Sequence, residues 1–172
     1  MSNGILIEIE SANTVARDGC SAIPLAEARE GVIPQLRDLF ALNAKLRDGE
    51  DLDRQARQEE RGSLRTVDVY AGSRYDWIIQ QYPEAPLEPF LAAFERWYER
   101  SLHDVASGRL SVTVFSAQIA RRLVSIHPCW NGSGRSARLF AGWVAMAYGQ
   151  LPVALDERTN IAQFATGRGL RT

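Results

Sequence analysis

The sequence is poor in cysteine and histidine and has no long apolar run. Its 172 residues include two cysteines and two histidines. Two cysteines without a recurring spacing predict neither a disulfide framework nor a structural zinc site. No segment approaches the roughly 20 apolar residues that a membrane-crossing helix needs, and the N-terminus shows no basic, apolar leader. We expect a soluble cytoplasmic protein with no membrane partner, although a specialised secretion route would leave no such mark.

An excess of charge of one sign is also missing. The chain has 20 basic and 21 acidic residues, for a formal net charge of −1. Such a balance gives no overall field that would recruit nucleic acid, so nucleic acid is not an expected partner. A local basic site remains compatible with it. The 45% hydrophobic content and the length suit one globular domain.

Hydrophobic spacing predicts a mainly α-helical domain. Helical periodicity marks residues 36–46, 90–105, 112–126 and 134–149. The last segment is apolar on nearly all sides, which predicts a central buried helix. Alternating runs at 64–70 and 75–79 around a Gly-Ser turn predict a β-hairpin, and a similar run at 5–9 predicts a short strand or extended arm.

The segment between the last two helices predicts an anion site beside a base. It reads HPCWNGSGRSAR at residues 127–138. A Gly-Ser-Gly turn that opens a helix offers backbone N–H groups and the positive end of the helix dipole to phosphates. Arg135 and Arg138 could each bind a phosphate with two hydrogen bonds. His127 could accept a proton from an attacking hydroxyl. The alternatives are a turn that only joins two helices and a structural histidine.

These residues resemble the signature of the Fic family, His-x-Phe-x-(Asp/Glu)-Gly-Asn-Gly-Arg-x-x-Arg. The matching positions are His127, Gly132, Gly134, Arg135 and Arg138. A hydrophobic run precedes the motif at 123–126, as in Fic domains. The stretch Gly-Ser-Leu-Arg at 62–65, followed by Val69, resembles the opening of the family's flap, a hairpin that aligns the target segment. The resemblance covers residues 34–157.

The resemblance implies a mainly α-helical Fic bundle with a small β-hairpin flap over the active site. It implies a protein adenylyltransferase, which transfers AMP from ATP to a Ser, Thr or Tyr hydroxyl of a target protein. The cofactors that it implies are ATP, or another nucleoside triphosphate, and Mg²⁺. His127 would be the catalytic base. Gly132, Ser133 and Gly134 would cradle the nucleotide phosphates, and Arg135 and Arg138 would bind the outer phosphates.

The same resemblance assigns the flap and divides the chain. Val67, Asp68, Val69 and Tyr70 would present the target strand by β-pairing. Residues 1–33 would form an N-terminal arm or helix with a regulatory role, 34–157 the catalytic domain and 158–172 a C-terminal tail. The biological settings that it leaves open are a toxin with an antitoxin partner, a secreted effector and housekeeping regulation.

Three positions depart from the family motif. Cys129 replaces the Phe, at a position that we interpret as a packing site for a small buried thiol. Asn131 replaces the acidic metal ligand, as in the relatives called mobile mystery protein B; its amide oxygen can contact Mg²⁺ but brings no charge. Ser133 replaces the Asn of Gly-Asn-Gly and keeps a hydroxyl near the α-phosphate.

Two hypotheses follow from these departures and from the N-terminal region. Glu30, in the sequence AEAREG at 26–31, resembles the Glu of the family's inhibitory helix and would pair with Arg138. A surface helix turn is the alternative. The transferred group could instead be phosphate, as in the Doc branch, or UMP, GMP or phosphocholine. The domain could also be a non-catalytic binding or regulatory module that uses the flap to dock a peptide.

Overall fold

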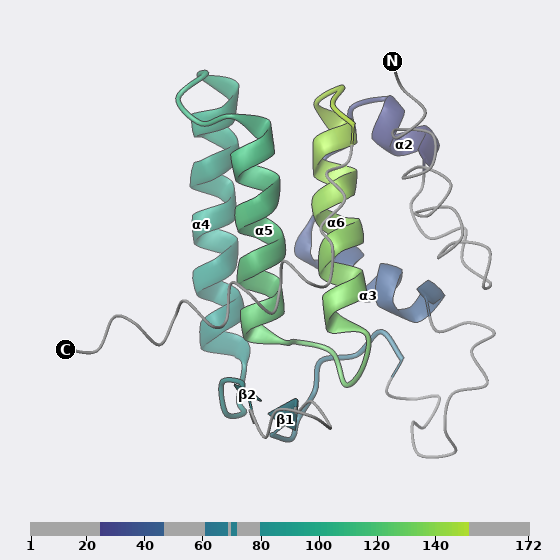
Figure 1. Cartoon of the computed structure of the whole chain (residues 1–172), viewed down its shortest axis with the longest axis vertical. Coiled ribbons are helices and arrows are strands. Elements are labelled where there is room, and N and C mark those ends of the chain that lie inside the picture. Colours follow the sequence, from purple (N-terminus) through teal and green to yellow (C-terminus); the bar gives the residue numbers. More distant parts are fainter. Residues whose placement is uncertain (1–24, 47–60, 69, 72–79, 152–172) are drawn as a thin grey trace.

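The computed structural model describes residues 25–46, 61–68, 70–71 and 80–151. Within these ranges the chain forms helices with one small β-sheet (Figure 1). The helices are α2 (Leu25–Arg29), α3 (Leu36–Leu46), α4 (Glu88–Ala106), α5 (Val112–Ile126) and α6 (Ser133–Ala147). The strands are β1 (Tyr70–Ala71) and β2 (Gln80–Gln81). The mainly α-helical class predicted from the sequence is confirmed.

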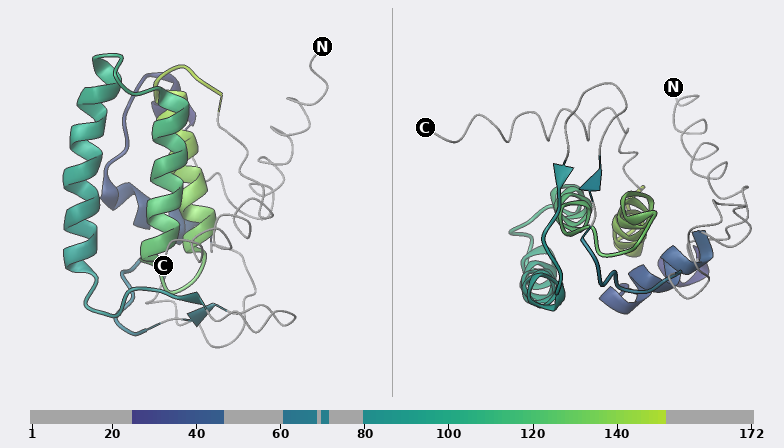
Figure 2. Two further views of the ribbon diagram at one scale, coloured as in Figure 1. Left: turned by 60° about the vertical axis from the view of Figure 1, so that its left-hand side comes forward. Right: turned by 90° about the horizontal axis from the view of Figure 1, so that it is seen from below.

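Helix α6 is the centre of the bundle. It packs against α5 on one side and against α3 and α2 on the other, while α4 covers α5 (Figures 1 and 2). Its side chains Phe140, Trp143 and Val144 are buried. A helix that is apolar on nearly all sides must be enclosed by its neighbours, as the sequence predicted.

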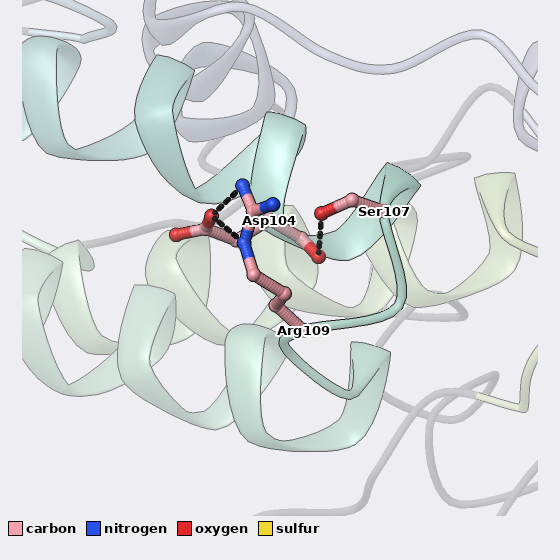
Figure 3. Close-up of polar contacts among 3 residues, drawn as sticks. All are labelled: Asp104, Ser107 and Arg109. Atoms are coloured by element: carbon pink, nitrogen blue, oxygen red, sulfur yellow. Dashed lines mark hydrogen bonds and ion pairs between the residues drawn. The ribbon is translucent and has the colours of Figure 1, made fainter.

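The turn between α4 and α5 is closed by contacts that are local in sequence. The Arg109 guanidinium contacts Asp104 Oδ1 at 2.7 and 3.0 Å, and Ser107 Oγ donates to the Asp104 carbonyl (Figure 3). Ser111 caps α5 by accepting a hydrogen bond from the Val114 N–H at 3.3 Å. A serine at this position satisfies one of the N–H groups that a helix start leaves without a partner.

The β-hairpin is present, but its strands lie later in the chain than predicted. Tyr70 pairs with Gln81 and Ala71 with Gln80, antiparallel. Leu64 instead forms an isolated antiparallel bridge with Cys129. The expected strand at 64–70 is therefore wrong over its first half, because that stretch lies against the 127–138 segment. The Gly-Ser pair of the predicted turn, at 72–73, and the predicted second strand at 75–79 lie outside the described residues.

The packed part of the chain begins before residue 34. Ala28 is fully buried, and the Val32 carbonyl accepts a hydrogen bond from Trp143 Nε1 at 2.9 Å. The predicted arm at 5–9, the charged stretch at 47–60 and the tail at 158–172 fall outside the described residues. In the part of the chain that the structure describes, no helix has the length and apolar character needed to span a membrane.

Candidate active site

The predicted base lies where α5 ends. His127 is the C-cap of α5, with a left-handed backbone (φ 51°, ψ 60°), and its N–H donates to the Leu123 carbonyl. Among the described residues it is the non-glycine residue with positive φ. Such a conformation is uncommon for side chains with a Cβ and is often found at functional sites. It turns the chain sharply from α5 into the loop that leads to α6.

The His127 ring is held between flap and bundle. It stacks on the Tyr82 ring with centroids 4.1 Å apart. Its Nδ1 is buried and has no hydrogen-bond partner among the described residues. Burial, and secondarily the positive charge of Arg65, lower the pKa of His127 from 6.5 to about 4. The imidazole is therefore neutral at physiological pH, which is the form that accepts a proton.

The residues of the predicted anion cradle lie at the N-terminus of α6. Gly132 is its N-cap in a left-handed conformation (φ 74°), and the first helical bond runs from the Ser136 N–H to the Gly132 carbonyl. The preceding N–H groups have no acceptor within the helix. A Cβ built on Gly132 would lie 3.6 Å from Arg135 Nη2, and one on Gly134 would lie 3.5 Å from Arg138 Nη1. Both guanidiniums therefore lie beside the first turn of α6.

Ser133 plays a different part from the one predicted. Its hydroxyl is buried, accepts from the Cys129 N–H and donates to the Cys129 carbonyl, both at 3.0 Å. The hydroxyl therefore closes the loop, which leaves the backbone N–H as the group that Ser133 can offer to the cradle. Cys129 is fully buried, in agreement with a packing role.

Asn131 is exposed beside the cradle. Its Oδ1 accepts from the Gly132 N–H at 2.6 Å. That oxygen keeps one further lone pair, which fits a single neutral contact to a cation. Among the described residues there is no group of three His, Cys, Asp or Glu side chains that could hold a metal ion.

Asn43 supports the cradle from α3, a helix outside the motif. Its fully buried side chain donates to the Asn131 carbonyl at 2.8 Å and to Ser136 Oγ at 3.0 Å, and its Oδ1 accepts from the Gly62 N–H. Sequence reasoning missed this role. The signal was present, because Asn43 is a polar residue on the apolar face of an amphipathic helix.

Arg65 is a second supporting residue whose role was not predicted. Its side chain is 1% exposed. Nε donates to the His127 carbonyl at 2.7 Å, Nη1 to the Val67 carbonyl at 2.7 Å and Nη2 to the Pro83 carbonyl at 2.6 Å. Its backbone N–H bonds the Pro128 carbonyl. Burial lowers the pKa of the Arg65 guanidinium. The Asp68 carboxylate and the Tyr82 hydroxyl, both nearby, act in the opposite direction.

The flap assignments are placed in part. Val67 is 47% exposed, and Asp68 is exposed while its Oδ1 accepts from the Ala85 N–H at 3.0 Å. Tyr70 lies in β1. Val69 falls outside the described residues. The sheet lies at the end of the bundle where α5 joins α6, which is the end that carries His127 (Figure 1).

Glu30 does not lie where the inhibitory hypothesis puts it. It follows α2, which packs on α6, and a Cβ on the adjacent Gly31 would be 3.5 Å from the Ala147 carbonyl at the C-terminal end of α6. Arg138 lies nine residues earlier, about 14 Å away along a helix that rises 1.5 Å per residue. Because the Arg138 head group lies towards Gly134, the two side chains are too far apart to pair in this structure.

Comparisons with known proteins bear on the relatives of the chain and on its fold. No family model matches the chain. A curated relative from Xanthomonas campestris pv. campestris, named uridine 5'-monophosphate transferase, is 34% identical over 127 residues, which are 73% of this chain. The aligned part is 23% of the relative, so the chain spans about a quarter of its length.

The fold is also found among solved structures. A Fic domain containing signaling protein from Bacteroides thetaiotaomicron matches with a TM-score of 0.63 and 19% identity, over 92% of this chain and 54% of that one. At this identity the likeness concerns the fold. Taken with the five motif positions at 127–138 and the relative in Xanthomonas, it leads to one conclusion: the chain has the fold of a Fic domain and carries a variant of the Fic motif.

Proposed function

We propose that this chain is a nucleotidyltransferase that transfers a nucleoside monophosphate from a nucleoside triphosphate to a hydroxyl of a target protein. One observation carries the proposal. A partly buried, neutral histidine stands at one end of a short loop, and a helix N-terminus flanked by two guanidiniums stands at the other. A proton acceptor and an anion cradle joined by so short a loop suit the attack of a hydroxyl on a phosphate.

In this mechanism the target Ser, Thr or Tyr oxygen attacks the α-phosphorus. His127 accepts the hydroxyl proton, the new oxygen–phosphorus bond forms, and the bond to the β-phosphate oxygen breaks to release pyrophosphate. The backbone N–H groups at the start of α6 stabilise the charge on the α-phosphate, and Arg135 and Arg138 stabilise the charge on the outer phosphates. The flap holds the target segment by strand pairing.

Mg²⁺ belongs to the substrate in this proposal. It would arrive with the nucleotide, neutralising phosphate charge, and Asn131 Oδ1 would offer it one neutral contact. Since a carboxylate is missing at this position, the chain itself contributes little to metal affinity. The nucleotide would instead be bound mainly by the N-terminus of α6 and by the two arginines.

Two donors deserve a direct comparison. Transfer of AMP from ATP is the activity that the Fic resemblance implies. Transfer of UMP is favoured by the name of the Xanthomonas relative, which aligns with 73% of this chain. Phosphate transfer of the Doc type and a non-catalytic binding role are the remaining alternatives. A pure binding role would leave the partly buried, neutral imidazole of His127 without a chemical use.

The donor is tested by label transfer into lysate proteins, with the wild type and His127→Asn. Asparagine is the chosen substitution because it tolerates a left-handed backbone but cannot act as a base. Label from the α-position of ATP or UTP should enter protein with the wild type alone. Entry of label from the γ-position would instead establish phosphate transfer, and equal labelling by His127→Asn would remove the histidine from the mechanism.

A further inference from the structure

The backbone of His127 needs support that the motif itself does not provide. Its left-handed conformation is unfavourable for a residue with a Cβ, so the surrounding contacts must hold it. The N–H bond to Leu123 is one such contact. It fixes the end of α5, but it leaves the His127 carbonyl to be satisfied from elsewhere.

The ring of His127 also lacks the usual orienting partner. In many catalytic histidines a group bound to the second ring nitrogen fixes the tautomer and the ring orientation. Here Nδ1 is buried with no partner among the described residues. Stacking on Tyr82 restricts the ring plane, and the remaining control over its position must come through the backbone.

Arg65 provides that control and links it to the flap. Val67 lies on the leg of the hairpin that enters β1, and Pro83 lies on the leg that leaves β2. The Arg65 guanidinium donates to the carbonyls of both legs and to the carbonyl of His127, all within 2.7 Å. A longer contact of 3.4 Å reaches the Ile126 carbonyl. Three segments that are distant in sequence therefore meet at one side chain.

We propose that Arg65 is a positioning residue that joins both legs of the flap to the backbone of His127, so that the flap and the base keep a fixed relative position. The inference rests on the proposed role of His127. A link to three carbonyls requires donors that point in several directions within one plane. A guanidinium has such donors, and an ammonium does not. Charge alone is therefore not enough at this position.

The direct test is Arg65→Lys, read by the NMR signals of the imidazoles. The chain has two histidines, so the spectrum is simple, and His127→Asn assigns the signal of His127. Because lysine keeps the charge, a change reports lost positioning. We expect the His127 signal to shift and its pKa to rise from about 4 towards 6.5, as the ring leaves its buried stack on Tyr82. Within the described ranges, the charged or titratable neighbours that bear on this ring are Arg65 and Tyr82.

The matched control is Arg109→Lys, which makes the same change in an exposed arginine at the opposite end of α4 and α5. It should leave the His127 signal in place. A folded Arg65→Lys variant whose His127 signal and pKa equal those of the wild type would overturn the inference.

A second variant keeps the idea testable if Arg65→Lys does not fold. Asp68 accepts the Ala85 N–H and so ties the same two legs together further out, at an exposed position. If the legs act on His127 through Arg65, Asp68→Ala should shift the His127 signal in the folded protein. An unmoved signal would contradict the link between flap and base.

Activity provides a separate readout. Arg65→Lys should lower kcat by roughly 10- to 100-fold, because small misplacements of a base are costly, while nucleotide Kd stays unchanged. The Arg65 side chain donates to carbonyls of the flap legs and of the end of α5, away from the start of α6, so a large loss of nucleotide affinity would argue for general damage. If the wild type transfers no nucleotide at all, the proposed function fails, yet the NMR comparison still decides the role of Arg65.

Discussion

The two ends of the α4–α5–α6 bundle are held together in different ways. At the turn end, residues 104–111, Arg109 and Ser107 contact Asp104 at separations of five and three residues, all near the surface. At the site end, which comprises the flap, the 127–138 loop and the start of α6, Asn43 contacts Ser136 across 93 residues and Arg65 contacts His127 across 62.

This difference shows where the fold depends on precision. A turn closed by neighbours in sequence tolerates change, because water replaces any contact that is lost. A buried side chain such as Asn43 leaves its partners without water when it is removed, and each unsatisfied group is costly. The geometry of the site end therefore depends on side chains that lie outside the motif.

The largest effect on stability is expected from Asn43→Leu. Leucine fills a similar volume but leaves the Gly62 N–H and the Asn131 carbonyl without their partner, and Ser136 Oγ loses one bond. The free energy of unfolding should fall by about 3 kcal/mol. Urea denaturation measures this free energy. A loss as small as the one expected from removing an exposed contact at the turn end would contradict the difference between the two ends.

A smaller loss is expected from Ser133→Ala. The Cys129 N–H and carbonyl, both inside the loop, lose the buried hydroxyl, which should lower the free energy of unfolding by about 2 kcal/mol. The matched control is Ser107→Ala, whose exposed hydroxyl also bonds a carbonyl. At a temperature where Ser133→Ala is folded, calorimetric titration should find that it still binds nucleotide. A loss of nucleotide binding would indicate instead that the Ser133 hydroxyl contacts the nucleotide.

The pH dependence of stability should be set in part by the site end. The pKa of His127 is about 4 when folded and 6.5 when unfolded, so between these values the unfolded state binds more protons. The free energy of unfolding should therefore decrease as the pH falls from 6.5 to 4. Denaturation across this range should show a shallower decrease in His127→Asn, and His103→Asn at the turn end is the control. Identical slopes for wild type and His127→Asn would refute the depressed pKa.

The smallest effect is expected from Arg109→Ala. The Arg109–Asp104 pair is exposed, with 60% and 43% of the two side chains accessible. Removing such a pair should change the free energy of unfolding by about 0.5 kcal/mol, since water screens the charges. A thermal melt compared with the wild type measures it. A loss as large as that of Asn43→Leu would erase the distinction between the two ends.

The same contrast explains what the sequence could predict. Periodicity located α3, α4, α5 and α6 because each helix is patterned by its own residues, and the motif located His127 and the start of α6 because it is contiguous. The hairpin was placed too early, because Leu64 pairs with Cys129, 65 residues further along. The roles of Asn43, Arg65 and Tyr82 depend on partners from other segments, and a period or a spacing within one segment does not encode them.

Glu30 shows that a local sequence pattern can also suggest a contact that the fold does not form. Its local sequence matched part of an inhibitory pattern, but the packing of α2 on α6 puts it near Ala147. Local resemblance can propose a pair, whereas only the three-dimensional arrangement decides whether the two side chains meet.

The central claim is that His127 and the α6 cradle together transfer a nucleotide. Intact-mass spectrometry of the wild type and His127→Asn, each incubated with Mg²⁺ and ATP or UTP, alone and with lysate, tests it most directly. The account predicts the added mass of one nucleoside monophosphate, on the chain or on a lysate protein, with the wild type only. No added mass with any nucleotide, in a wild type that binds nucleotide, would contradict it.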